Sequence, residues 1–342
     1  MSTLVIGLDY QSFRRRTWNA MKRSVSTSGE LGLNLTAIVP TKNRHDLLKI
    51  TIKSLTEIKE IQKIIVVDDG SASPVQIAHP KVLLMRNSDS KGEGASINMA
   101  TEFVQTQYIV VVSDDDPQFF SWIPEIAKKI ANYPDYIAYY PSIVKVSENL
   151  ETQKIWAVKF SKRDILYFDF MPCLAGVVIN YQKAKDLGLG NLRGLEIYPN
   201  DFLQWFELSR YGKFKAVPES QACWHLHSHQ MSNTLGSDIK SIQYLSNVLA
   251  WKNLHIKRFR NVAVASTMWR YFQLISVDSP KTLIHFRSNA VLMKKQIDEN
   301  FSSLIIGFLS LAVSGIYLFF RKILRLIQTF LLSLFFTLNR KY

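Results

Sequence analysis

The chain has 342 residues, enough for one large folded domain with additional segments, and 47% of them are hydrophobic. This composition excludes a disordered, collagen-like or disulfide-scaffold protein, since only Cys173 and Cys223 are cysteines. The net charge of +14 comes from the flanks: residues 31–250 hold 23 basic and 23 acidic side chains, whereas residues 1–30, 251–300 and 301–342 carry +3, +6 and +5. A neutral body with basic flanks beside apolar sequence favours a membrane surface over nucleic acid as partner. With no disulfide framework and no cationic, then apolar leader, we expect a cytosolic protein.

Short apolar runs alternate with helical periodicity in the first half of the chain. Strands that are buried on both faces and alternate with helices predict an α/β fold with a parallel sheet. Ligands bind such sheets beyond the carboxyl ends of the strands. The predicted strands are Leu35–Val39, Ile64–Val67, Val82–Met85 and Tyr108–Val112, and the predicted helices are His45–Ile58 and Ala95–Val104.

The second half of the chain is less regular. It predicts strands at Tyr136–Tyr140, Ile155–Phe160, Gly176–Ile179 and Phe214–Val217, an extended segment at Trp224–His229, a helix at Asp201–Tyr211, and helical structure from Ser237 to about residue 298. The predicted domains are a basic arm at 1–33, a catalytic domain at 34–235, a helical extension at 236–300 and a membrane-associated segment at 301–342.

Two of the predicted strands end in acid clusters. Asp114, Asp115 and Asp116 follow a buried strand, and carboxylates this close raise one another's pKa unless a cation or backbone donors compensate. A divalent ion shared with substrate phosphates is one solution, and a solvated turn that caps a helix near Ser121 is the alternative. The Asp68-Asp69-Gly70-Ser71 segment could bind a nucleobase or ribose, with the glycine permitting close backbone approach, or form an ordinary turn.

Motifs of several other nucleotide-binding or hydrolytic folds are missing. Gly92-Glu93-Gly94 does not complete GxGxxG, because Ile97 stands where the third glycine belongs. The sequence contains neither GxxxxGK[ST] nor the GxSxG elbow.

Four motifs occur in an order that resembles the family-2 glycosyltransferases of GT-A fold. They are Ile38–Arg44, Val67–Ser71, Gly92–Asn98 and Ser113–Asp116. A further stretch, Asn200-Asp201-Phe202-Leu203 with Arg210 and Gly212, looks like the Glu-Asp motif of that family. The resemblance covers about residues 34–230.

The resemblance implies roles for individual residues. Asp201 matches the general base, although Asn200 replaces the usual neighbouring acid. A histidine of the 225–229 region, for which we choose His227, completes the metal shell. The nucleotide pocket is lined by Pro40, Thr41, Asn43 and Arg44, and the base is contacted by Asp68 or Asp69. Asn98 opens the helix beside the donor site. The DxD pair that holds Mn²⁺ or Mg²⁺ on the donor diphosphate is matched by Asp116 with Asp114, or with Asp115 since Ser113 shifts the frame.

These implied roles are chemically coherent. A divalent ion stabilises the charge that develops on a leaving nucleotide diphosphate, and one base without a protein nucleophile suits inversion at the anomeric carbon. Several alternatives stay open. Asp201 could be a helix N-cap, the alternating His225, His227 and His229 could bind zinc, and Trp205 and Trp224 could stack on an acceptor sugar or pack in the core.

The C-terminal segment is the most apolar part of the chain. Phe301–Phe320 contains no charge and is long enough to span a bilayer, while Arg321, Lys322 and Arg325 interrupt the apolar sequence after it. Since nucleotide sugars are cytosolic, one span would place these basic residues outside, against the positive-inside tendency. We therefore favour an amphipathic helix in the membrane plane over a single span or a helix buried on the body.

Together these observations predict a metal-dependent, inverting glycosyltransferase on the cytoplasmic face of a membrane. It would move a sugar from a nucleotide-sugar donor to a glycan or lipid-linked acceptor in cell-surface polysaccharide synthesis. One alternative is a sugar-nucleotide nucleotidyltransferase, but Pro40-Thr41-Lys42-Asn43-Arg44 after the first strand contains no glycine. The other is a catalytically inactive, membrane-bound glycan-binding scaffold, for which the replacement at Asn200 leaves room.

Overall fold

A computed structural model of the chain describes residues 33–118, 122–147, 151–155, 157, 159–168, 175–190, 200–227, 237–257, 260–264 and 266–267, of which 200–202 and 237–245 are described by their backbone alone. The chain divides into two compact units, residues 1–165 with 170–236 and residues 166–169 with 237–342. The first unit contains the whole of the sheet. The helix α9 (Ser237–His255) belongs to the second unit.

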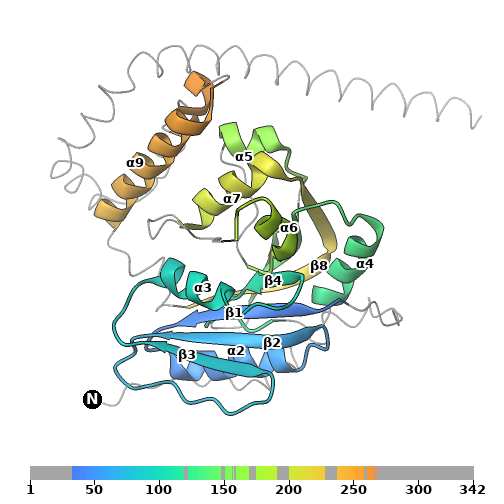
Figure 1. Cartoon of the computed structure of the whole chain (residues 1–342), viewed down its shortest axis with the longest axis vertical. Coiled ribbons are helices and arrows are strands. Elements are labelled where there is room, and N and C mark those ends of the chain that lie inside the picture. Colours follow the sequence, from blue (N-terminus) through green and yellow to red (C-terminus); the bar gives the residue numbers. More distant parts are fainter. Residues whose placement is uncertain are drawn as a thin grey trace, which may run out of the picture. The chain divides into compact units, whose positions relative to one another are not determined.

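The first unit is built on a mixed, largely parallel sheet (Figure 1). Its strands run in the order β3-β2-β1-β4-β7-β5-β6, and β8 pairs with β5. Among the described strands, β7 and β6 run antiparallel to their neighbours. The strands are β1 (Leu35–Thr41), β2 (Ile61–Asp69), β3 (Val82–Asn87), β4 (Tyr108–Val111), β5 (Ala138–Ser147), β6 (Thr152–Ile155), β7 (Val178–Asn180) and β8 (Phe214–Leu226).

Helices cover both faces of this sheet (Figure 1). One set of alternate strand residues, including Leu35, Ala37 and Val39 of β1, forms one hydrophobic core with α2 (His45–Thr56) and α4 (Trp122–Asn132). The intervening residues, such as Ile38 and Ile65, are also fully buried, and α3 (Glu93–Thr101) packs on β1 and β2. Burial on both faces explains why these strands are continuous β-branched runs. Further helices are α5 (Lys162–Phe168), α6 (Tyr181–Asp186) and α7 (Asn200–Tyr211).

The predicted α/β fold is confirmed, and the predictions are most accurate in the first half of the chain. Every strand and helix predicted there is present, with ends shifted by a few residues. In the second half β8 is one strand where two segments were predicted. Its pairing with β5 skips from Val217 to Gln221, so that residues 218–220 bulge at Pro218, which has no N–H to donate. The strand predicted at Ile155–Phe160 is wrong, because β6 ends at Ile155.

The parallel register brings the predicted acid clusters to one edge of the sheet. Thr41 at the end of β1 pairs with Asp68 of β2, and Asp69 pairs with Asn87 at the end of β3. The Val112 N–H donates to the Ile38 carbonyl, so the chain continues beside β1 after β4. The aspartates that follow therefore lie at the same edge. Parallel strands that begin at one edge must end at the other, so that one edge collects these polar side chains.

Candidate active site

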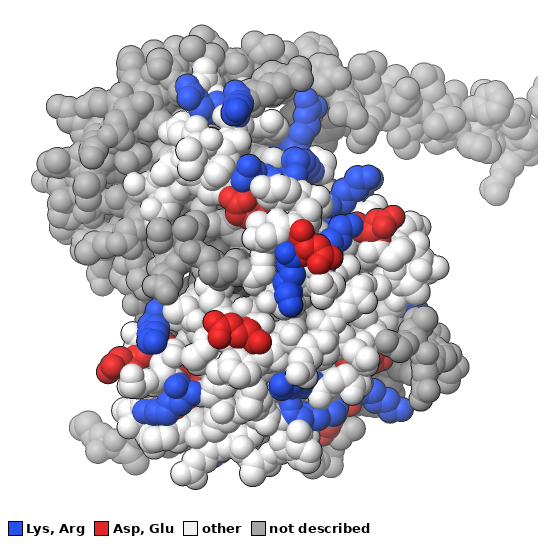
Figure 2. All heavy atoms as spheres, viewed as in Figure 1, with Lys and Arg blue, Asp and Glu red and all other residues white. Residues whose placement is uncertain are grey.

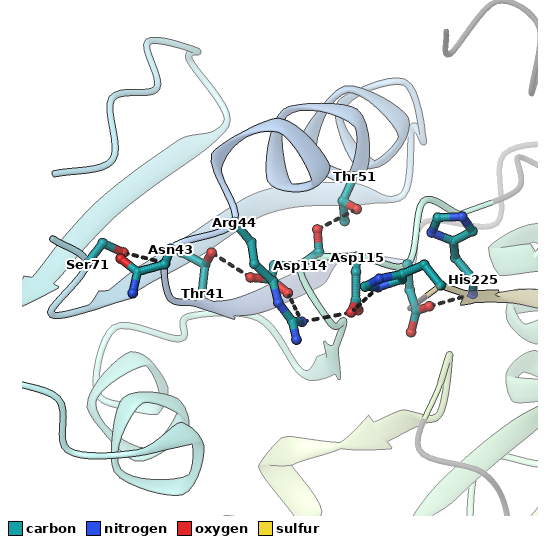
Figure 3. A network of polar contacts seen from close by, with 10 residues as sticks. Thr41, Asn43, Arg44, Thr51, Ser71, Asp114, Asp115 and His225 are labelled. Atoms are coloured by element: carbon teal, nitrogen blue, oxygen red, sulfur yellow. Dashed lines mark hydrogen bonds and ion pairs between the residues drawn. The ribbon is translucent and has the colours of Figure 1, made fainter. Parts of the chain in front are cut away.

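Three consecutive aspartates lie buried at the carboxyl edge of the sheet, and two of them, Asp114 and Asp115, are labelled in Figure 3. Asp114, Asp115 and Asp116 follow β4 and are only 5%, 6% and 5% exposed. Burying carboxylates is costly unless hydrogen bonds or opposite charges compensate. The neighbours of this cluster therefore determine what it can do, and they differ from one aspartate to the next.

Two residues of the first motif contact the cluster from the end of β1 (Figure 3). The Thr41 hydroxyl donates to Asp114 Oδ2 at 2.7 Å. Arg44 Nη1 donates to Asp114 Oδ1 at 3.0 Å and to Asp115 Oδ2 at 2.7 Å. One guanidinium nitrogen thus bridges two carboxylates, and the roles of Thr41 and Arg44 in nucleotide binding stay predictions.

The histidine-containing strand reaches the cluster from the other side. The backbone N–H of His225 donates to Asp116 Oδ1 at 2.8 Å, and His227 Nε2 lies 2.9 Å from Asp115 Oδ2. The two imidazole rings are 5.2 Å apart, as expected for side chains on one face of a strand. His229 lies outside the described residues. Of the histidines considered, His227 has its ring within hydrogen-bond distance of Asp115.

The electrostatics of the cluster reflect burial and mutual repulsion. Burial raises the pKa of Asp114 to about 6, although Thr41 and Arg44 act in the opposite direction. Burial, together with the neighbouring Asp115, raises the pKa of Asp116 well above its ordinary value. Burial alone would lower the pKa of Arg44, but Asp114 and Asp115 outweigh it and raise that pKa. Arg44 thus offsets part of the repulsion among these carboxylates.

Side chains outside the predicted set hold the aspartate loop in place. Thr51 of α2 donates to the Asp114 carbonyl at 3.0 Å (Figure 3), and Ser54 Oγ accepts from the Gln118 N–H at 2.9 Å. Gln118 also joins the loop to β8: its Nε2 donates to the carbonyls of Asp116 and Cys223, and its Oε1 accepts from the Cys223 N–H. None of these three side chains was predicted from the sequence. A signal exists for Thr51 and Ser54, which are hydroxyl groups on the apolar face of a helix that also carries Leu48 and Leu55.

The second predicted cluster points into the protein. Asp69 accepts four hydrogen bonds, from the Asn87 amide and the Ser90 hydroxyl and from the backbone N–H groups of Lys91 and Gly92, at 2.7–2.9 Å. Burial would raise the pKa of Asp69, but these donors outweigh it and lower the pKa to about 2. A carboxylate has about four lone-pair positions, so both oxygens of Asp69 are saturated by the chain's own loop.

The neighbouring Asp68 is also engaged within the chain. It accepts from the backbone N–H groups of Ser71 and Val75, and Arg86 forms an ion pair with it. The prediction that Asp68 or Asp69 contacts the base of the donor is not tested by these contacts. They do show that each of the two carboxylates orders a loop at the carboxyl edge of the sheet.

The remaining predicted nucleotide-site residues lie near the same edge. Asn43 has φ 57°, a left-handed conformation that asparagine tolerates, and its Oδ1 accepts from the Ala72 N–H at 2.8 Å. Gly70 (φ 69°) lies so close to Asp89 and Ser90 that a Cβ would overlap their backbone, so the glycine permits close packing of the chain's own loops. Pro40 is half-buried on β1. Asn98 lies in the second turn of α3 and does not open it, because the helix begins at Glu93.

The predicted base is on α7. This helix begins at Asn200, so that Asp201 lies in its first turn. Trp205 is buried and its ring meets that of Phe214 edge-on at 5.8 Å, so it packs in the core and does not form a sugar platform. Trp224 is half-buried, with Lys145 Nζ 4.6 Å from its ring centre.

The donor set at the aspartates suits a hard divalent cation. Buried carboxylate oxygens are ligands that Mn²⁺ and Mg²⁺ accept, and the His227 imidazole lies beside them. Within the described ranges, no three His, Cys, Asp or Glu side chains form a ready-made cation cage. Such a cage is not required, because Mg²⁺ is usually held by one or two carboxylates together with substrate phosphates and water.

The fold is shared with solved glycosyltransferase structures. Residues 1–349 of TarS from S. aureus match with 13% identity and a TM-score of 0.54 over 79% of this chain and 83% of that one. The complex of that fragment with UDP-GlcNAc matches with 12% identity and a TM-score of 0.57 over 79% and 81%, and its UDP complex with 13% identity and a TM-score of 0.53 over 79% and 89%. No curated protein matches this sequence.

The sheet topology and these structural matches therefore show an α/β fold of GT-A type. Residues 36–182 match the family described as Glycosyl transferase family 2, and the chain carries a domain of this family and is a glycosyltransferase. The match contains β1 to β7 with the aspartate cluster, and it ends before α7 and β8. The roles of Asp201 and His227 therefore remain predictions.

Membrane attachment was predicted for a segment outside the described residues. In the part of the chain that the structure describes, no helix is both long enough and apolar enough to cross a bilayer. On the face seen in Figure 2, acidic and basic side chains are interspersed with uncharged surface, in keeping with the balanced charge of residues 31–250.

Proposed function

We propose that this glycosyltransferase moves a sugar from a nucleotide-sugar donor to a glycan or lipid-linked acceptor, with inversion and with a divalent metal, during cell-surface polysaccharide synthesis. The observation that carries the proposal is the buried aspartate cluster at the carboxyl edge of the sheet, within the matched family domain. The UDP-GlcNAc complex of the structurally similar TarS fragment makes UDP-sugars the first donors to test.

The cluster is suited to hold the diphosphate end of a donor. Asp116, together with Asp114 or Asp115, would ligate the cation with His227, whose Nε2 lies 2.9 Å from Asp115 Oδ2. When bound, a divalent cation stabilises the negative charge that develops on the leaving nucleotide diphosphate. Arg44, which already bridges Asp114 and Asp115, orients these carboxylates and keeps the site from becoming uniformly negative.

The acceptor hydroxyl needs a base within hydrogen-bond reach, for which we propose Asp201 at the start of α7. The carboxylate takes the hydroxyl proton as the acceptor oxygen attacks the anomeric carbon and the nucleotide diphosphate leaves. This single displacement inverts the anomeric configuration. A positioned base contributes about 10²–10⁴-fold to the rate.

We further propose that the chain works on the cytoplasmic face of a membrane. Two properties of the sequence support this: the uncharged stretch Phe301–Phe320 and the basic residues directly after it. Attachment at a membrane surface would bring the site to a lipid-linked acceptor.

The test is a panel of nucleotide sugars incubated with the full chain and candidate acceptors, with Mn²⁺ and with a chelator. We expect turnover with Mn²⁺ and its loss in chelator or in Asp116→Asn. Asp201→Asn should lower kcat by about 10²-fold or more while donor binding, measured by thermal shift, stays unchanged.

The matched control is Asp46→Asn, the same change at an exposed aspartate of α2, which should leave turnover unchanged. Turnover that persists in chelator would remove the metal from the proposal. Full activity of Asp201→Asn would remove the base, and failure of every donor to bind or react would overturn the proposal as a whole.

A further inference from the structure

Gln204 of α7 is a buried amide without a hydrogen-bond partner in the part of the chain that the structure describes. The residue is only 3% exposed, and neither Nε2 nor Oε1 is paired there. Folding removes water from both groups without providing another hydrogen-bond partner, which is energetically unfavourable. Such a group in a native structure needs an explanation, and a bound ligand can supply one.

The other buried side-chain amides that the structure describes behave differently. Gln118 makes hydrogen bonds through both Nε2 and Oε1, Asn87 donates to Asp69 and Ser96, and the Asn180 oxygen caps α6. The fold thus pairs amides of this kind where it uses them for its own structure. Gln204 departs from that rule, and its position on α7 suggests the reason.

The position is in the first half of α7. The C-terminal end of the helix lies at the amino edge of the sheet. Gly212 packs there against Ile137, and the Ile137 N–H donates to the Lys213 carbonyl. These residues directly precede the paired starts of β5 and β8. A helix of this length spans roughly 18 Å. Its first turns, which hold Asp201 and Gln204, are therefore the part farthest from that edge.

The chemistry of the amide indicates the kind of ligand. A primary amide presents a donor and an acceptor side by side and carries no charge. Neighbouring hydroxyl groups of a sugar offer the complementary acceptor and donor. A phosphate would satisfy only the donor, and a cation only the acceptor.

We propose that Gln204 binds hydroxyl groups of a sugar held at the first turns of α7, either the transferred sugar or the acceptor. The inference rests on the proposed function, because it takes Asp201 to lie where the acceptor is deprotonated. It makes Gln204 a specificity-determining residue for one of the two sugars. When the sugar binds, its hydroxyl groups form hydrogen bonds with Nε2 and Oε1 of Gln204, so that the substrate is the partner of the amide.

The test is Gln204→Met, which keeps the volume of the side chain and removes both polar atoms. We expect the ligand-free protein to gain a few degrees in Tm, about 2–5 °C, because the unsatisfied groups are gone. We also expect kcat/KM to fall by about 10-fold or more, because the sugar hydroxyls lose their partner. Stabilisation combined with loss of activity is a result that a purely structural role would not produce.

The two sources of the sugar are separated by kinetics. A rise in KM for the donor, and a slower hydrolysis of the donor without acceptor, assigns Gln204 to the transferred sugar. A rise in KM for the acceptor alone assigns it to the acceptor. The matched control is Leu208→Met on the same helix, a buried and volume-conserving change that should leave both values unchanged.

Two results would overturn the inference. If wild-type and Gln204→Met chains have the same kcat/KM, whatever the change in Tm, then Gln204 holds no substrate. If Gln204→Met lowers the Tm of the ligand-free protein, then the amide has a structural partner. A wild-type chain that neither binds nor turns over any nucleotide sugar would instead overturn the proposed function, and the inference with it.

Discussion

Asp69 shows how a carboxylate at a strand end can order the loop that follows it. Its position in the second motif favoured a contact with the nucleotide, yet both of its oxygens accept hydrogen bonds from residues 87–92. The loop that Asp69 holds leads into α3, which begins at Glu93. The chemistry of the residue is that of a loop anchor.

This anchoring has a pH dependence of known sign. Since the pKa of Asp69 is lowered to about 2 in the folded protein, its stabilisation is complete above its unfolded pKa near 3.8 and is lost as the pH falls towards 2. The contribution is on the order of 2 kcal/mol. Asp69→Asn should therefore lower the free energy of unfolding at pH 7, and the difference from wild type should shrink between pH 4 and 2. Denaturant unfolding across this range measures it, and a difference that is constant with pH would contradict it.

At the scale of secondary structure, the site depends on how β8 is joined to the aspartate loop. Gln118 bonds to Asp116 and Cys223, and the His225 N–H bonds to Asp116, so that the loop after β4 and the distant strand form one unit. These contacts position His227 against Asp115. Neither element alone would hold this arrangement.

Gln118→Met tests this connection. The change leaves the Asp116 carbonyl and both backbone groups of Cys223 without their Gln118 partner, and we expect a loss of about 2–4 kcal/mol in the free energy of unfolding. We also expect a higher KM for the donor when the variant is assayed below the denaturant concentration at which it begins to unfold. Gln62→Met, at an exposed glutamine with one local hydrogen bond, is the control. Unchanged stability and KM would show that β8 is held by other contacts.

Gly176, in the turn before β7, is a second element-scale feature. It has φ 73°, and a Cβ would lie 2.3 Å from that of Ala222 and 3.0 Å from the Trp122 indole nitrogen. Gly176→Ala should therefore cost about 1–2 kcal/mol for the left-handed backbone and about 1–3 kcal/mol more for overlap. Gly188→Ala has the same φ class (74°) but open space, and should show the first cost alone. Thermal unfolding of both variants measures the difference, and equal losses would contradict the steric explanation.

At the scale of the whole molecule, the distribution of charge separates a neutral enzyme body from basic flanks. The flank after Phe301–Phe320 carries the residues that we expect at an anionic membrane surface. Replacing Arg321, Lys322 and Arg325 together by Gln in the full chain should weaken binding to anionic vesicles by roughly 3 kcal/mol, about 100-fold, at about 1 kcal/mol per residue.

Co-sedimentation with anionic and with neutral vesicles measures this effect. Binding that is lost in high salt indicates attachment in the membrane plane, because surface charges are screened. Binding that resists both salt and the triple replacement would contradict in-plane attachment and indicate a spanning segment. Neutral vesicles serve as the control, since the replacement should change binding to them little.

The sheet and the location of the site were predictable from sequence because they depend on local patterns. Runs such as Ile64–Val67 are apolar on both faces and are followed at once by carboxylates, so that strand, buried position and polar end are all encoded within about ten residues. The partners of those carboxylates were not predictable. The His225 N–H is 109 residues from Asp116 in sequence, Asp69 turns to its own loop, and Gln204 has no partner among the described residues. Apolar periodicity is a property of neighbouring residues, whereas a hydrogen-bond partner is chosen by distant segments that only the folded chain brings together.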